Sequence, residues 1–295
     1  AIRRMQELVN AGYQYAVCID LAKFFDRVNH DRLLSILARS TRDKRVLRLI
    51  RAFLNAGVMR DGVVIETKEG TPQGSPLSPI LSNIVLDELD KELDQRGLHV
   101  VRYADDCVSL GRSRRAGQRV MDSVSRVITR RLKLRVNEAK RRVAEAWYIK
   151  YLGFGLTMRK GDSRIRIHSR SYQRFKEHIR ELTGRKRGRS LEQVIGELNC
   201  FIRGWWNYFG IAETRSQLRS LNGWIMRRLR ALVWHHWKRP RTRVRHLKGA
   251  GVHPERARCV GNARKRAWRL SRNQHVVYAL PNRYFISRGL VLLGA

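Results

Sequence analysis

Tyr103-Ala104-Asp105-Asp106 carries more information about the architecture of this chain than any other stretch, because two adjacent carboxylates stand between two short apolar runs. Val100-Val101 precedes them and Cys107-Val108-Ser109-Leu110 follows, which predicts a β-hairpin whose turn presents the acids. Carboxylates this close repel one another unless a cation lies among them, so the pair suggests a magnesium site. Taken alone, an Asp-Asp pair is far more often a solvated turn than a metal site.

A second acid ends an apolar strand upstream. Tyr15-Ala16-Val17-Cys18-Ile19 is a continuous apolar run that finishes at Asp20, and the ends of buried strands often deliver functional groups. An aromatic turn and a helical pattern through Leu33 and Leu37 follow. We therefore expect Asp20 to lie beside the Asp105 hairpin.

A rigid, polar loop separates these two acidic segments. Gly70-Thr71-Pro72-Gln73-Gly74-Ser75-Pro76-Leu77-Ser78-Pro79 contains half of the six prolines in the chain. Proline and glycine at this density end regular structure, and the apolar spacing beyond them predicts a helix that begins near Ile80.

Together, the Asp20 to Asp26 block, the Pro72-Gln73-Gly74 loop and the Tyr-Ala-Asp-Asp hairpin resemble the reverse transcriptases, in the same order along the chain. Asn137-Glu138-Ala139-Lys140 resembles their palm lysine motif, and Tyr151-Leu152-Gly153-Phe154 resembles their primer-grip hairpin. The sequence Gln-Gly-Ser-Pro-Leu-Ser-Pro is similar to the form of this loop in the group II intron branch of the reverse transcriptases. The resemblance implies an α+β right-hand polymerase palm with an antiparallel sheet and partial fingers.

The resemblance also implies roles for individual residues. Asp20 and Asp105 would be the principal ligands of two Mg²⁺ ions, with Mn²⁺ as a substitute, and Asp106 would support them. Phe25 would select deoxynucleotides, and Gln73 and Gly74 would lie under the templating base and the incoming nucleotide. Lys140 would assist the departing pyrophosphate, although a Lys-Arg-Arg run is also typical of a solvated or phosphate-facing segment. The primer grip would comprise Tyr151, Leu152, Gly153 and Phe154.

The charge of the chain indicates a polyanionic partner. Lys and Arg number 62 against 25 Asp and Glu, which leaves a formal net charge of +37 on 295 residues. Residues 1–155 carry +11 and residues 156–295 carry +26, so the second part holds most of the excess. Such a chain is expected to bind nucleic acid with a steep salt dependence. A ribosomal-type basic protein would explain the charge but not the acidic motifs.

The second part is predicted to be helical. Apolar positions from Leu191 to Phe209 recur at helical spacing, with Gly210 at the end, and a second helix runs from Leu218 to Trp237. The stretch Ile195 to Phe209 resembles the group II intron maturase-specific domain, a helical thumb called X. We expect a palm with partial fingers over 1–156, an all-α thumb/X domain over 157–245, and a basic nucleic-acid-binding region over 246–295.

Two basic connectors, residues 183–190 and 238–245, are either solvated or in contact with phosphates, and we favour phosphate contact. The candidate nucleic-acid contacts are Arg185, Lys186, Arg187, Arg203, Arg227, Arg228, Arg241 and Arg243. The four cysteines are widely spaced, which argues against a zinc site and a disulfide framework. No apolar run is long enough to span a bilayer.

The resemblance implies an RNA-directed DNA polymerase and maturase of a mobile group II intron. Its partners would be the intron RNA, an RNA template with a DNA primer, target DNA and deoxynucleoside triphosphates, in a ribonucleoprotein of the bacterial cytoplasm. Relatives carry a long segment before the position of Ala1, so we expect a protein truncated at its N-terminus. A non-catalytic RNA-binding maturase module remains the alternative, and an enzyme domesticated for CRISPR acquisition or phage defence is a third possibility.

Overall fold

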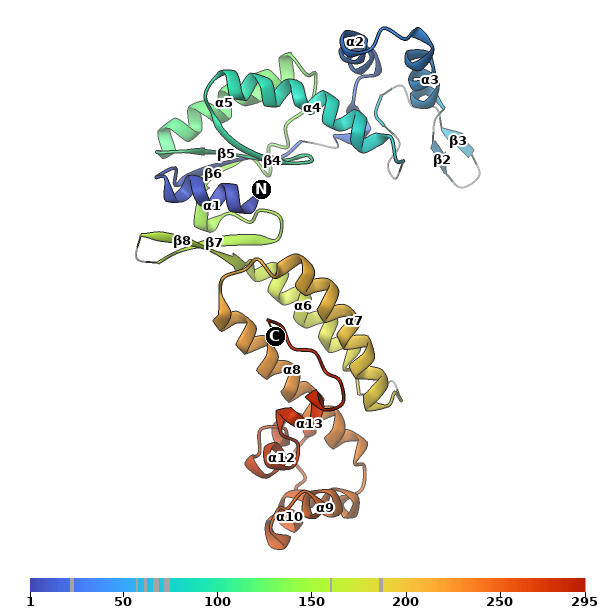
Figure 1. Cartoon of the computed structure of the whole chain (residues 1–295), viewed down its shortest axis with the longest axis vertical. Helices are drawn as coiled ribbons and strands as arrows, with labels where there is room; N and C mark the ends of the chain where they lie inside the picture. Colours follow the sequence, from blue (N-terminus) through green and yellow to red (C-terminus); the bar gives the residue numbers. More distant parts are fainter. Residues whose placement is uncertain are drawn as a thin grey trace. The chain divides into compact units, whose positions relative to one another are not determined.

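The computed structural model describes the chain except residues 22–23, 57, 61–62, 66–68, 72–74, 160, 186–187 and 295. The chain divides into two compact units, Ala1–Ile165 and Arg166–Ala295. The first combines helices with a sheet and the second is built almost entirely of helices (Figure 1). The predicted fold class, an α+β palm followed by a helical thumb, is confirmed. The finer division into 1–156, 157–245 and 246–295 stays a prediction.

A four-stranded antiparallel sheet forms the centre of the first unit. Its strand order is β4-β5-β1-β6, with β4 at His99–Tyr103, β5 at Asp106–Gly111, β1 at Tyr15–Ile19 and β6 at Arg142–Glu145. The predicted strand before Asp20 is therefore an inner strand, which explains its continuous apolar character. Ala16, Val17 and Ile19 are all almost completely buried.

Helices cover both faces of this sheet. α4 (Ser78–Gln95) and α5 (Arg114–Arg130) lie on one face, and α1 (Ile2–Asn10) lies on the other (Figure 1). The approach of α5 is close because Gly117 has no side chain: a Cβ there would lie 2.7 Å from Val143 Cγ1 and 3.3 Å from Val17 Cγ2. Tight packing of this kind fixes the strand ends that carry the acids.

The remaining elements of the first unit extend from this core. The short helix η1 (Phe25–Arg27) leads to α2 (His30–Ser40) and α3 (Lys44–Asn55), and β2 (Val58–Arg60) pairs with β3 (Val63–Ile65). After β6 come η2 (Ala146–Tyr148), β7 (Phe154–Arg159) and β8 (Asp162–Ile167). Ser163 of β8 donates its backbone N–H and its hydroxyl to Asn10 Oδ1, at 2.8 and 2.6 Å. These bonds attach the β7–β8 hairpin to α1.

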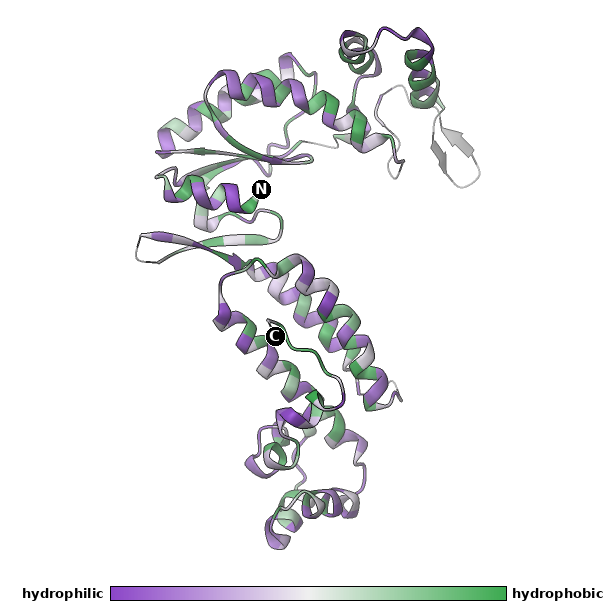
Figure 2. Ribbon diagram, in the orientation of Figure 1, coloured by the Kyte–Doolittle hydropathy of each residue, from purple (hydrophilic) through white to green (hydrophobic). Residues whose placement is uncertain are grey.

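The second unit begins with the three long helices α6 (Ser169–Leu182), α7 (Leu191–Phe209) and α8 (Arg215–His236). A capping box between Ser190 and Gln193 starts α7. α7 and α8 confirm the two long helices that apolar spacing predicted. Apolar and polar residues alternate around these helices (Figure 2). Shorter helices follow: α9 (Pro240–Gly249), α10 (Pro254–Gly261), α11 (Ala267–Leu270), α12 (Gln274–Ala279) and α13 (Asn282–Ile286).

One predicted connector is wrong. The basic stretch 238–245 was expected to be a loop, whereas from Pro240 onward it forms α9. Proline suits the first turn of a helix because its fixed φ is helical and its missing N–H has no partner there anyway. Arg and Lys have good helix propensity, and the buried Leu247 anchors the helix.

Within the described part of the chain, none of the helices is long and apolar enough to cross a membrane.

Candidate active site

The Tyr-Ala-Asp-Asp motif forms the turn of a tight β-hairpin, as predicted. Tyr103 ends β4 and pairs with Asp106 at the start of β5, so Ala104 and Asp105 occupy the turn. Ala104 has a φ of 53°, in the left-handed region that two-residue hairpin turns use but that alanine rarely adopts. Asp105 is half-buried, and Asp106 reaches solvent.

Asp20 lies on the strand next to this hairpin. β1 pairs with β5 in a register that sets Ile19 opposite Cys107, so the next position along β1, Asp20, comes beside Asp106. The side chain of Asp20 is 25% exposed, so most of it is sheltered at the end of a buried strand. The sheet thus brings together two acids separated by more than eighty residues.

These carboxylates interact electrostatically. The pKa of Asp106 is raised from its usual value because the group is partly buried and because the negative charges of Asp105 and Asp20 lie near it. Lys140 and Lys150 oppose this rise. A cation between these carboxylates would reduce their mutual repulsion.

Lys140 lies at the same place. Its Nζ is 3.0 Å from Asp20 Oδ2, although the lysine side chain is 66% exposed. Asn137 donates its side-chain N–H to the same Oδ2 at 3.0 Å and its backbone N–H to the carbonyl oxygen of Asp20 at 2.8 Å. The Asn137 to Lys140 segment therefore holds the Asp20 carboxylate from one side.

Arg102 is a site residue that the sequence analysis missed. Its Nε donates to Oδ1 and Oδ2 of Asp90 on α4, at 2.8 and 2.9 Å, and its Nη2 forms a further short bond to that carboxylate. Its Nη1 donates to the carbonyl oxygen of Ala104 at 2.9 Å. Arg102 thereby ties the strained turn to α4. The arginine one residue before the motif was the available signal, but its partner Asp90 is not recognisable from sequence.

The primer-grip motif forms a second tight turn. Tyr151 and Phe154 exchange both backbone hydrogen bonds, at 3.0 and 2.9 Å, and Leu152 and Gly153 between them have φ values of 49° and 79°. The buried Tyr151 hydroxyl donates to the carbonyl oxygen of Val101, 3.2 Å away on β4. Tyr151 thus supports the hairpin, and the primer-grip role of the motif stays a prediction.

Residues 2–156, more than half of the chain, match the family described as reverse transcriptase (RNA-dependent DNA polymerase). The chain belongs to this family. Residues 172–251 of the reverse transcriptase match a second family, the group II intron, maturase-specific domain. Enzymes of the reverse transcriptase family generally use divalent metal ions.

Relatives of the reverse transcriptase include the group II intron-encoded protein LtrA of Lactococcus lactis, 39% identical over 27% of this chain and 13% of that protein. Protein YkfC of Escherichia coli is 39% identical over 27% of this chain and 21% of its own length. The aligned segments therefore span about a fifth or less of these relatives. A telomerase from Candida tropicalis in complex with a telomeric RNA fragment aligns with 97% of this chain and 50% of its own, at 12% identity and a TM-score of 0.49.

The acidic site of the reverse transcriptase fits a hard divalent cation by the chemistry of its donors, which are carboxylate oxygens. Among the residues that the structure describes, no three His, Cys, Asp or Glu side chains gather closely enough to hold a metal ion. The Nζ of Lys140 is the cation now paired with Asp20. The assignment of Asp20, Asp105 and Asp106 as metal ligands therefore stays a prediction.

Three substrate-site predictions lie partly or wholly outside this description. Gln73 and Gly74 fall outside the described residues. The backbone of Phe25 opens η1, five positions after Asp20, and its proposed role in selecting deoxynucleotides stays a prediction.

The predicted nucleic-acid contacts of the reverse transcriptase separate into two groups. Arg185, Arg203 and Arg241 are exposed, whereas Lys186 and Arg187 are outside the described residues. The second group, which comprises Arg227, Arg228 and Arg243, is half-buried and donates hydrogen bonds to protein atoms. Arg227 Nη2 donates to the carbonyl oxygen of Trp268 at 3.0 Å, and Arg228 Nε donates to Thr183 Oγ1 at 2.8 Å. Arg243 Nε donates to the carbonyl oxygen of Trp237 at 2.8 Å. The second group therefore also stabilises the helical unit.

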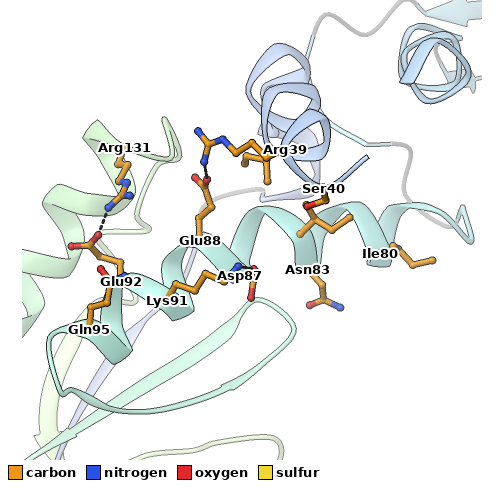
Figure 3. A pocket seen from close by; sticks show the side chains of 12 residues that line it. Arg39, Ser40, Ile80, Asn83, Asp87, Glu88, Lys91, Glu92, Gln95 and Arg131 are labelled. Carbon is orange, nitrogen blue, oxygen red and sulfur yellow. Dashed lines mark hydrogen bonds and ion pairs between the residues drawn. The ribbon is translucent and has the colours of Figure 1, made fainter. Parts of the chain in front are cut away.

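A cavity of about 600 Å³ lies along α4, and its lining does not include Asp20, Asp105 or Asp106. Ion pairs between Arg39 and Glu88 and between Arg131 and Glu92 cross its wall (Figure 3). None of the predicted site residues that the structure describes lines it.

Proposed function

We propose that this chain is the polymerase and maturase part of a group II intron-encoded reverse transcriptase. It would bind the intron RNA, assist its splicing and copy it into DNA from a primer. One observation carries this proposal: the β1–β5 register sets Asp20 beside the Asp105-Asp106 hairpin, in a chain that also matches the maturase-specific domain.

Asp20 and Asp105, with support from Asp106, would hold two Mg²⁺ ions, which Mn²⁺ can replace. When bound, these ions activate the primer 3′-hydroxyl and stabilise the leaving pyrophosphate. Around them, Arg102 fixes the turn that carries Asp105 through its bond to Ala104 O. Asn137 orients the Asp20 carboxylate.

Lys140 has two positions in this proposal. Without a bound nucleotide its Nζ pairs with Asp20. Its side chain is largely exposed, so it is free to swing toward the phosphates of an incoming deoxynucleotide. There it would offset charge on the departing pyrophosphate.

RNA-templated primer extension tests the polymerase activity. The full chain would be supplied with Mg²⁺, deoxynucleotides and a primed RNA at low salt. We expect extension by the wild type and at least a 1,000-fold loss in the double variant Asp105→Ala, Asp106→Ala. The control is Asp87→Ala, Asp94→Ala, which removes two exposed acids from α4 and the same charge. Equal extension by both double variants would contradict the proposal.

The second candidate is an RNA-binding maturase that does not polymerise. The net charge of +26 on residues 156–295 and the match to the maturase-specific domain favour it. Its test is splicing of a group II intron at reduced Mg²⁺. Assistance that survives the Asp105→Ala, Asp106→Ala change, with no primer extension by the wild type, would support this candidate over the first.

A further inference from the structure

A cavity of about 320 Å³ in the helical unit has an unusual lining. It lies among α6, α8 and α11 and the turn that follows α6. Its walls consist of Arg180, Thr183, Arg185, Trp224, Arg228, Ala231 and Trp268. Ligand cavities range from roughly 300 to 1,000 Å³, so this one has room for a single small group and none for a duplex.

Positive charge is concentrated around this cavity. Three of the lining residues are arginines, and none of the described residues that line it is acidic. The pKa of Arg228 is lowered from its usual value by burial and by the positive charges of Arg185 and Arg180. Cations forced together in this way gain most from an anion that lies between them, as a phosphate does.

Two indole rings form the rest of the wall. Lys176 Nζ, Arg180 Cζ and Arg228 Cζ lie 5.1, 5.6 and 5.7 Å from the Trp224 ring centroid. Arg227 Cζ lies 3.7 Å above the Trp268 ring. Both tryptophans are only partly buried. Flat indole faces beside arginines are the arrangement on which unstacked bases of single strands pack, each worth about 1–3 kcal/mol.

Part of the cluster is already held in place. Arg228 donates from Nε to Thr183 Oγ1 at 2.8 Å and from Nη2 to the carbonyl oxygen of Arg180 at 3.2 Å. Arg180 and Arg185 have exposed side chains. The cavity thus has one fixed guanidinium at its wall and two at its rim, which suits a ligand that enters from solvent.

We propose that this cavity binds one nucleotide of a single-stranded RNA, with the phosphate between Arg180, Arg185 and Arg228 and the base against Trp224 or Trp268. The inference rests on the proposed RNA partner and adds a site and a mode of contact. Sequence-tolerant stacking would let the helical unit capture an unpaired nucleotide of a folded RNA, since such bases are the ones proteins reach.

The direct test uses an eight-nucleotide single-stranded RNA with 2-aminopurine at its centre and the full chain at low salt. Stacking on an indole quenches this base, so we expect quenching on binding. We expect no quenching with the duplex of the same length, and at least fivefold weaker binding of a ribose-phosphate chain without bases. Unquenched binding would overturn the proposal.

A pair of matched double variants locates the site. Arg180→Gln, Arg185→Gln is expected to weaken binding about tenfold, abolish the quenching and lower the salt slope by about 0.7, since the one phosphate that these arginines neutralise on a single strand contributes about 0.7. Arg174→Gln, Arg256→Gln removes two exposed arginines elsewhere in the same unit and should retain the quenching. Equal effects of the two variants would overturn the proposal.

Competition and catalysis provide the remaining distinctions. Displacement of the labelled RNA by adenosine monophosphate would indicate that the cavity also binds free nucleotides. No displacement would indicate that the cavity binds a nucleotide only as part of an RNA strand. Both results agree with a nucleotide as the ligand. Displacement by inorganic phosphate as effective as that by the nucleotide would refute stacking. Quenching should persist in Asp105→Ala, Asp106→Ala, so failed polymerisation and a failed cavity give different results.

Discussion

Replacing Arg102 by Met removes the attachment of the Asp105 hairpin to α4 while keeping an unbranched apolar stem. The Arg102 side chain is 17% exposed and that of Asp90 is 31% exposed. A charge-assisted, bidentate contact in such surroundings contributes about 1.5–3 kcal/mol, and the exposure of Asp90 places this pair near the middle of the range. We therefore expect a loss of about 2 kcal/mol in the stability of the hairpin.

The same change releases the turn. Ala104 keeps its φ of 53° with the help of the Arg102 Nη1 bond to its carbonyl oxygen. A left-handed alanine costs about 1 kcal/mol or more, so the turn relaxes once this bond is lost. Asp105 would then shift from its position beside Asp20, and we expect primer extension to fall at least tenfold.

Hydrogen exchange measures this effect locally in the full chain. A loss of about 2 kcal/mol corresponds to roughly 25-fold faster exchange, because each 1.4 kcal/mol is a factor of ten. The increase should appear in peptides covering 99–111, whereas peptides of α7 serve as the internal control. Arg51→Met, which removes an exposed ion pair with Asp31, should change exchange of the hairpin very little. Less than a threefold increase in Arg102→Met, with normal extension, would refute this reasoning.

Three further changes probe the same unit. Asp106→Asn should raise the thermal midpoint at pH 7 and flatten its dependence on pH. The pKa of Asp106 is raised in the folded protein, so the wild type loses stability as the pH rises through that pKa. An unchanged pH profile of the thermal midpoint would count against this prediction. Tyr151→Phe removes the hydroxyl bond to Val101 O and should accelerate exchange of β4 by about fivefold, equivalent to about 1 kcal/mol; exchange at the wild-type rate would show that the bond contributes nothing. His30→Leu leaves the carbonyl oxygen of Gly70 without the buried His30 Nε2 contact at 2.6 Å, so urea unfolding should show a loss of about 1–3 kcal/mol, and a loss below 0.5 kcal/mol would contradict it.

Local patterns were sufficient to predict several of the elements. The strand before Asp20 and the helix over 191–209 follow from apolar periodicity, which depends only on which residues face the core. The hairpin at 103–106 follows from two acids between apolar runs. The stretch 238–245 forms α9 from Pro240 onward rather than a loop, because proline suits the first turn of a helix, which charge density does not reveal.

The surroundings of the acids were harder to predict. Lys140 was selected by resemblance alone, and nothing in the sequence indicated that its Nζ lies 3.0 Å from Asp20. The motif of Tyr151 resembles a primer grip, and nothing in the sequence indicated that its hydroxyl also bonds to β4. The sequence does not single out Arg102, because its partner Asp90 belongs to α4, the helix that precedes β4.

The sequence by itself indicated the family, through the resemblance of its motifs, and predicted several elements and three candidate acids, because residue types at fixed local spacing carry this information. Only the tertiary structure decided what surrounds them. The bonds of Arg102, Asn137 and Tyr151 depend on the distance and direction between groups that packing brings together. The arginine and tryptophan cavity is likewise assembled from α6, α8 and α11. A contact between helices that are far apart in the chain leaves no periodic signal in the sequence.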